Sequence, residues 1–259
     1  MLMGKLQRLM EAREARNELE YQEALDQLPP MWRSKFAELL CFAIQYMITT
    51  MDIRRGQEGI VNMPKNFYEI QEEAGLKFFA KSRGEASKNY PMESQNLDNS
   101  GLILFHQSKN VPYSSGRLFE LYVNALNPNC NRLFQRLREG SSCFDPNNLD
   151  ETCLFVNEPL GKNKVAKMLK TLCRAVDKPD NLTNHSCRGD AISLLFRNGF
   201  DSHMVQFLSE HASLESLNNY HHQLDMKDRV QMAIALQTGS LQDYEKYRHK
   251  FEDVPMGKF

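Results

Sequence analysis

Apolar side chains recur at helical spacing along most of the chain, and this pattern predicts a mainly helical protein. From Trp32 to Met51 the apolar positions follow a period of about 3.6 residues, which predicts one long core helix. Weaker runs of the same spacing predict further helices over residues 116–126, 162–178, 186–198, 202–208, 214–220 and 225–238. Gly199 and Gly239 follow two of these runs, at the position where glycine commonly ends a helix. Asp201 or Ser202 offers an N-cap for the helix that begins between them.

The first segment, residues 3–27, is also rich in helix-forming residues and stops before Pro29 and Pro30. Its apolar content is thin, and charges of both signs are spread along it. We therefore expect a solvated helix or a connector here, rather than a part of the core.

The region 66–92 is the best candidate for β-structure. Residues 76–81 predict one strand, residues 83–85 a turn around Gly84, and residues 87–90 the returning strand. Residues 139–151 predict a loop. The predicted fold class is mainly α with a small antiparallel β-sheet (α+β).

Composition narrows the class of protein without indicating a function. Of the 259 residues, 41% are hydrophobic and 25% charged, so we expect an ordinary globular protein of one large or two small domains. No window approaches about 18 uncharged apolar residues, and the charged N-terminal segment lacks the apolar core of a secretory signal. We expect neither a membrane span nor export. The six cysteines form no Cys-x-x-Cys pair, which argues against a zinc knuckle or ribbon. Because we expect no export, we expect reduced thiols.

The 32 basic and 33 acidic residues nearly cancel, so an argument for nucleic acid must rest on a local patch. Residues 162–178 form such a patch, because six basic residues and one acidic residue lie there beside an apolar stripe. The candidate contacts to a DNA backbone are Lys162, Lys164, Lys167, Lys170 and Arg174. A solvated helix face is the alternative interpretation.

Four residues in the C-terminal half suit chemistry at a phosphodiester. His185 and Arg188 share one face of a predicted helix, and His211 and Tyr220 follow them. A tyrosine can attack phosphorus and form a phosphotyrosine, and a histidine can take the proton that the tyrosine loses. An arginine stays ionised and offers a planar fork of donors to the phosphate oxygens.

Two basic residues upstream would complete such a site. Arg54 follows the predicted core helix and would supply a second guanidinium, with Arg55 as the alternative register. Lys88 could protonate the departing 5′-oxygen, with Lys81 as the alternative. Preorganised positive charge of this kind can take the place of a metal ion in phosphoryl transfer, so we expect neither a metal nor another cofactor.

The sequences around these residues resemble one known family. TNHSCR at 183–188, EH at 210–211 and SLNNY at 216–220 resemble the catalytic end of tyrosine recombinases. MDIRRGQE at 51–58 and LGKN at 160–163 fit the same comparison. The resemblance covers residues 35–235 and is closest to the eukaryotic Crypton-type transposon recombinases. The animal zinc-finger MYM-type and glutamine-rich nuclear proteins derived from Cryptons share these sequences.

The resemblance implies the tyrosine recombinase catalytic-domain fold, similar to that of lambda integrase. It also implies DNA cleavage and rejoining, as in site-specific recombination or transposon integration, through a covalent 3′-phosphotyrosine. The catalytic residues that it implies are Arg54, Lys88, His185, Arg188, His211 and Tyr220. Among the departures from the family pattern, Glu210 replaces the usual glycine and adds negative charge beside the phosphate site. The acidic residue that the family has soon after the first arginine corresponds to Gln57 or Glu58, depending on the register. A helical segment of about 30 residues stands where the family usually has a separate DNA-clamping domain.

The implied domains are residues 1–30 as an N-terminal charged helix or connector, 31–240 as the catalytic domain, and 241–259 as a tail. The implied partners are double-stranded DNA and further copies of the chain. The implied location is the nucleus, or the cytoplasm if the eukaryotic resemblance does not hold. Two alternatives stay open. One is a decayed, domesticated domain that acts as a DNA- or chromatin-associated interaction module, and the other is topoisomerase-like relaxation of DNA by the same chemistry.

Overall fold

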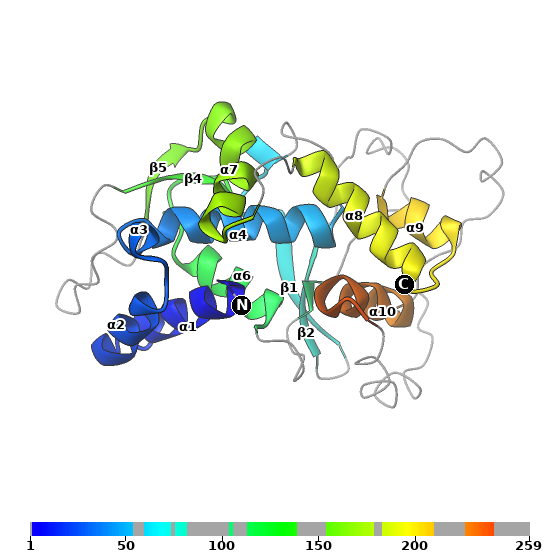
Figure 1. Ribbon diagram of the computed structural model, residues 1–259, viewed down its shortest axis with the longest axis horizontal. Helices are drawn as coiled ribbons and strands as arrows, with labels where there is room; N and C mark the ends of the chain where they lie inside the picture. Colours follow the sequence, from blue (N-terminus) through cyan, green and yellow to red (C-terminus); the bar gives the residue numbers. More distant parts are fainter. Residues whose placement is uncertain are drawn as a thin grey trace.

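In the part of the chain that the structure describes, the elements are helices and two small antiparallel sheets (Figure 1). The computed structural model describes residues 2–53, 60–73, 76–81, 104–105, 113–138, 154–178, 183–209 and 226–240. The helices are α1 (Leu2–Glu14), α2 (Glu18–Asp26), α3 (Pro30–Arg33), α4 (Phe36–Met51), α6 (Ser115–Asn124), α7 (Lys162–Ala175), α8 (Asn184–Arg197), α9 (Ser202–Ser209) and α10 (Met226–Thr238). The strands are β1 (Tyr68–Glu73), β2 (Leu76–Lys81), β3 (Leu104–Phe105), β4 (Gln135–Leu137) and β5 (Phe155–Pro159). The predicted α+β class is confirmed.

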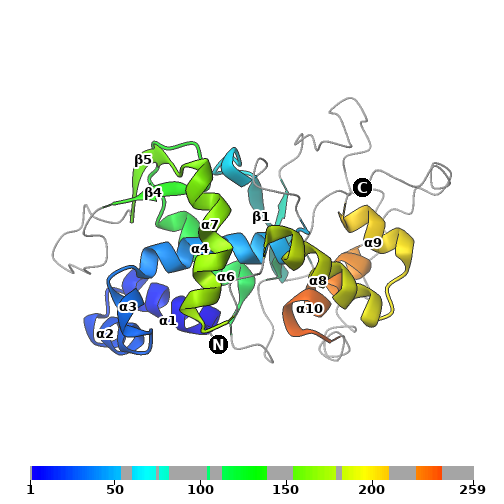
Figure 2. The ribbon, with the colours of Figure 1, turned by 45° about the horizontal axis from the view of Figure 1, so that its top comes forward.

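Helix α4 lies at the centre of the fold, where α1, α6, α7, α8 and α10 contact it (Figure 1, Figure 2). Its sequence, FAELLCFAIQYMITTM, is apolar on nearly every side, and such a helix is stable when it is buried all round. Leu39, Leu40 and Ile44 are fully buried. The core helix predicted between Trp32 and Met51 is therefore confirmed, with the short helix α3 before it.

Helix α1 belongs to the core, so the expectation of a solvated helix is wrong. Leu6 and Leu9 are fully buried and Met10 is nearly so, in the same apolar cluster as α4 and α6. Leu9 and Met10 follow Leu6 by three and four positions, so the three side chains form one apolar stripe. Helix α1 packs this stripe against α6. A few large apolar side chains are enough to bury a helix when they all share one face.

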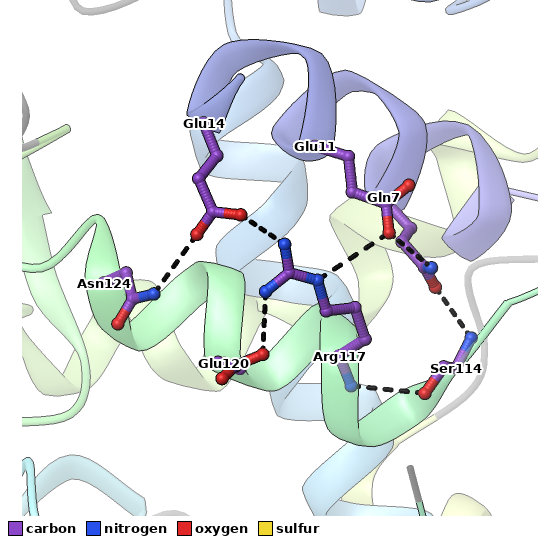
Figure 3. Close-up of polar contacts among 7 residues, drawn as sticks. All are labelled: Gln7, Glu11, Glu14, Ser114, Arg117, Glu120 and Asn124. Carbon is purple, nitrogen blue, oxygen red and sulfur yellow. Dashed lines mark hydrogen bonds and ion pairs between the residues drawn. The ribbon is translucent and has the colours of Figure 1, made fainter. Parts of the chain in front are cut away.

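Polar contacts also join α1 to α6, around Arg117 (Figure 3). The Arg117 guanidinium pairs with Glu14 of α1 and with Glu120 of its own helix, the latter at 2.7 Å. The backbone N–H of Ser114, which caps α6, donates to the side-chain oxygen of Gln7 at 2.7 Å. Partly exposed ion pairs contribute at most about 1 kcal/mol each, so the buried leucines hold α1 more firmly than these contacts do.

The helix predicted over residues 3–27 is broken in two. Arg16 has a left-handed backbone, with φ of +55°, which ends α1. Asn17 then caps α2 by accepting a hydrogen bond from the Glu20 N–H at 3.2 Å. Asparagine followed three residues later by glutamate is a helix-start signal. The sequence therefore contained a signal for the start of α2.

The larger sheet has the strand order β1-β2-β3, with antiparallel neighbours. The strand predicted at 76–81 is confirmed as β2. It pairs with β1, which precedes it, over the whole register from Tyr68↔Lys81 to Glu73↔Leu76. A second sheet of β4 and β5 was not predicted, because strands of three and five residues are too short to show a clear alternation.

The predicted boundaries of the C-terminal helices are confirmed at three positions: two helix ends and one helix start. Gly199 and Gly239 follow α8 and α10 with φ of +83° and +79°, a conformation that glycine adopts without strain. Asp201 is the N-cap of α9, since its side chain accepts hydrogen bonds from the His203 and Met204 N–H groups at 2.8 and 3.0 Å. Local side-chain chemistry fixes these boundaries.

Helix α10 joins the same core by packing on α8, α4 and β3. Met232 and Ala235 are buried in the main apolar cluster. Gln237 adds polar contacts, because its amide donates to the Tyr113 carbonyl at 3.3 Å and its side-chain oxygen lies 3.3 Å from the Ser115 hydroxyl. This helix is therefore anchored on its own chain.

Four predicted elements lie outside the described residues: the turn at 83–85, the returning strand at 87–90, the loop at 139–151 and the helix at 214–220. Within the part of the chain that is described, no helix has the length and apolar character needed to cross a membrane.

Candidate functional site

Helix α8 carries two of the predicted site positions near its start. Thr183 and Ser186 cap the helix reciprocally, since the hydroxyl of each accepts a hydrogen bond from the backbone N–H of the other, at 3.1 and 3.3 Å. The cap places position 185 in the first turn and Arg188 nearly one turn later. The helical spacing predicted for this pair is confirmed, and the His185 side chain lies outside what the structure describes.

The Arg188 side chain is buried, with 6% of its surface exposed. Its Nη1 donates a hydrogen bond to the Ile53 carbonyl oxygen, and its Nη2 donates to the Ser209 carbonyl oxygen. We call these three residues the Arg188 junction, because they join α8 to the ends of α4 and α9. A buried charge is costly unless it is hydrogen bonded, so the two carbonyls favour one orientation of the guanidinium.

The α4 end of the junction has an unusual backbone. Asp52 caps α4, with its N–H donating to the Ile48 carbonyl at 3.0 Å, and Ile53 follows with φ of +46°. This left-handed conformation costs a residue other than glycine about 1–2 kcal/mol. The Ile53 side chain is 1% exposed, so burial of its apolar surface offsets the strain.

A second buried polar contact lies at the same turn. The Tyr68 hydroxyl donates to Asp52 Oδ2 at 2.7 Å, and the two residues are 5% and 3% exposed. Tyr68 begins β1, so this contact joins the end of α4 to the sheet. Strand β2, which pairs with β1, ends at Lys81.

Most of the other predicted site residues lie outside the described part of the chain. Arg54, Lys88, His211 and Tyr220 are among these, so the structure does not test their convergence. The structure does bring together the chain positions that precede Arg54 and His211. Residue 53 directly precedes Arg54, residue 209 lies two positions before His211, and the carbonyls of both accept hydrogen bonds from one guanidinium.

Helix α7 has the two faces predicted from its sequence. Val165 and Met168 are fully buried against the core, and the basic side chains lie on the exposed face. The exposed basic residues are Lys162, Lys164, Lys167, Lys170 and Arg174. Lys164 also forms an ion pair with Glu38 of α4.

Several nucleophilic side chains of the described residues are poorly suited to attack. Burial raises the pKa of the Cys187 thiol, next to Arg188 in the sequence, to about 11, so the thiol stays protonated at pH 7. Burial also raises the pKa of Tyr113 to about 12 and that of Tyr122 well above its usual value. No group of histidine, cysteine and acidic side chains suited to a metal ion is found among the described residues.

The sequence analysis missed the residues at the Arg188 junction and at the turn beside it. Asp52 carried a usable signal, because an acidic residue at the C-terminal end of a helix opposes the helix dipole and needs another reason to be there. Tyr68 and Ser209 carried no such signal in the sequence. Their partners, Asp52 and Arg188, lie 16 and 21 positions away, and only the fold brings each pair together.

Comparison with known proteins gives one match. The sequence model described as the phage integrase family matches residues 88–227, which is more than half of the chain. The matched range includes every predicted site residue except Arg54, together with the basic helix α7. No curated protein and no solved structure matches the chain.

Proposed function

Because the chain belongs to the phage integrase family of tyrosine recombinases, we propose that it cuts and rejoins double-stranded DNA through a 3′-phosphotyrosine formed at Tyr220. The observation that carries this proposal is the Arg188 junction. One buried guanidinium binds backbone that precedes Arg54 and backbone that precedes His211, although Ile53 and Arg188 are 135 positions apart in the sequence. A single phosphate-binding site requires convergence of this kind.

In the proposed reaction the Tyr220 hydroxyl oxygen attacks phosphorus while the bond between phosphorus and the 5′-oxygen breaks. His185 accepts the tyrosine proton, and His211 donates a hydrogen bond to the phosphate. Lys88 gives a proton to the departing 5′-oxygen, with Lys81 as the alternative donor. Attack of a 5′-hydroxyl on the phosphotyrosine reverses these steps and rejoins the strand.

Arg54 and Arg188 have a different task in this mechanism, with Arg55 as the alternative register for the first. Charge builds on the non-bridging phosphate oxygens as the tyrosine attacks, and two guanidiniums neutralise it. The carbonyls of Ile53 and Ser209 orient Arg188 before DNA binds. Such preorganisation makes charge stabilisation effective, because the donors need not reorganise during the reaction.

The polarity of the covalent link tests this chemistry. We expect a strand radiolabelled at its 5′ end to become attached to the protein, because the tyrosine takes the 3′-phosphate. A strand labelled at its 3′ end should release a labelled fragment with a free 5′-hydroxyl. Retention of the 3′ label would contradict the proposal, because it indicates a 5′-phosphotyrosine. Relaxation of supercoiled DNA without strand exchange would favour the topoisomerase-like alternative.

We propose that the exposed basic face of α7 contacts the DNA backbone near the cleaved phosphate. The double variant Lys167→Glu/Lys170→Glu is therefore expected to weaken duplex binding without regard to sequence. The slope of log K against log salt concentration should fall by about 0.9 for each lost phosphate contact. Arg8→Glu, on the exposed side of α1, is the matched control and should bind like the wild type. Equal slopes for the double variant and the control would contradict the proposal that α7 contacts the DNA backbone.

We also propose that strand exchange uses several copies of the chain on DNA, since each copy supplies one tyrosine. The TNHSCR and SLNNY sequences support a closer relationship to Crypton-type transposon recombinases, and with it a nuclear location. The family match supports DNA recombination in general.

A further inference from the structure

The carbonyl of Ile53 accepts a hydrogen bond from the Arg188 guanidinium, so whatever holds that carbonyl in place also affects Arg188. Ile53 is strained, and a strained turn relaxes unless its surroundings hold it in place. The residue before it, Asp52, is joined to Tyr68 by a buried hydrogen bond of 2.7 Å. This bond is placed to stop the turn from relaxing.

Tyr68 is itself held firmly. Its ring makes edge contacts with Phe67 and with Phe119 of α6, at centroid distances of 4.8 and 5.5 Å. The hydroxyl is therefore presented to Asp52 by a packed aromatic cluster, and aromatic rings in this arrangement stabilise one another. The sheet and α6 thus contact the end of α4 through the hydrogen bond between Tyr68 and Asp52.

Packing alone does not account for Asp52. A buried carboxylate is costly, and its place at the C-terminal end of α4 is also unfavourable for the helix dipole. An apolar residue would fill the position at lower cost. A carboxylate there supplies an oxygen that accepts the Tyr68 hydrogen bond.

We propose that Asp52 and Tyr68 are positioning residues for Arg188, which act through the Ile53 carbonyl; this inference rests on the proposed function. Loss of their hydrogen bond lets the turn relax, and the Ile53 carbonyl then moves away from Nη1. The guanidinium keeps its charge and its Ser209 contact but no longer points in one fixed direction. The consequence is weaker neutralisation of the phosphate as the tyrosine attacks.

Two DNA substrates separate this role from a merely structural one. The first is a duplex that the wild-type protein cleaves, with its natural phosphodiester at the cleaved position. The second carries a methylphosphonate there, in which a methyl group replaces a charged oxygen. Because less charge develops on the neutral linkage, cleavage of it depends less on a well-placed guanidinium.

Tyr68→Phe is expected to slow adduct formation on the phosphodiester by about 10-fold, and on the methylphosphonate by less than about 3-fold. Asp52→Asn keeps an oxygen acceptor for the Tyr68 hydroxyl and should restore nearly the wild-type rates on both. Asp52→Leu should behave like Tyr68→Phe. The rates are compared at equal concentrations of folded protein.

Tyr122→Phe is the matched control. It also removes a buried hydroxyl with a 2.7 Å hydrogen bond, in this case to the Leu133 carbonyl, and it lies outside the Arg188 junction. We expect it to lower both rates by the same factor or to leave both unchanged.

Equal losses on the two substrates in Tyr68→Phe would overturn the positioning role and leave the proposed function intact. A wild-type protein that forms no adduct with any duplex would overturn the proposed function and this inference together. The two failures are therefore distinguishable.

Discussion

Arg188→Ala is expected to abolish adduct formation and to lower the free energy of unfolding. The substitution removes the donors to the Ile53 and Ser209 carbonyls, and each buried acceptor that loses its hydrogen bond costs about 1–3 kcal/mol. Urea denaturation should therefore show a loss of about 2–6 kcal/mol. The rate of adduct formation should fall by at least about 100-fold, because one of two charge-neutralising groups is gone.

Arg188→Lys separates charge from geometry. Lysine keeps the positive charge, but a single ammonium lacks the planar fork that reaches two carbonyls in different directions. We expect an intermediate stability and a rate close to that of Arg188→Ala. Arg8→Ala, at an exposed arginine, should change stability by less than about 0.5 kcal/mol. An Arg188→Ala protein with the unfolding midpoint of the wild type would show that the junction does not hold the fold together.

Leu9→Ala is expected to destabilise the whole domain, because α1 is part of the core. Leu9 is fully buried, and truncation of a buried leucine to alanine typically costs about 2–5 kcal/mol. The loss should appear in one cooperative transition, observed both by far-ultraviolet circular dichroism and by fluorescence of Trp32. A helix that merely preceded the domain would unfold separately and at lower urea concentration.

Leu19→Ala provides the control for this prediction. Leu19 lies in α2 and is 71% exposed, so its truncation should cost less than about 0.5 kcal/mol. Equal small effects of Leu9→Ala and Leu19→Ala would contradict the placement of α1 in the core and would support the connector expected from the sequence.

The sequence predicts those elements whose signals are local. The apolar run of α4, the amphipathic α7, and the boundaries at Gly199 and Asp201 depend on residues close together in the chain, and all four are confirmed. The burial of α1 is different, because it depends on the apolar face that α6 offers to it more than one hundred positions later. The spacing of apolar residues within α1 does not show that α6 will cover them.

The same distinction applies to the candidate site. The spacing of positions 185 and 188 on one helix face follows from helix geometry, and the structure confirms it. The burial of Arg188 and its two carbonyl partners could not be predicted, because a guanidinium near a phosphate site is ordinarily expected to face solvent. The contact between Asp52 and Tyr68 arises only once the sheet packs on the end of α4.

Covalent capture of DNA shows whether Tyr220 is the nucleophile. The probe is a random duplex pool with 5′-bridging phosphorothiolates, whose sulfur leaves without a proton from Lys88 or Lys81. We expect an adduct with the wild-type protein that survives denaturation and is absent from Tyr220→Phe. A folded wild-type protein that binds the pool and forms no adduct would contradict the proposed function and leave a DNA-associated interaction module. An adduct that persists in Tyr220→Phe would contradict the assignment of the nucleophile.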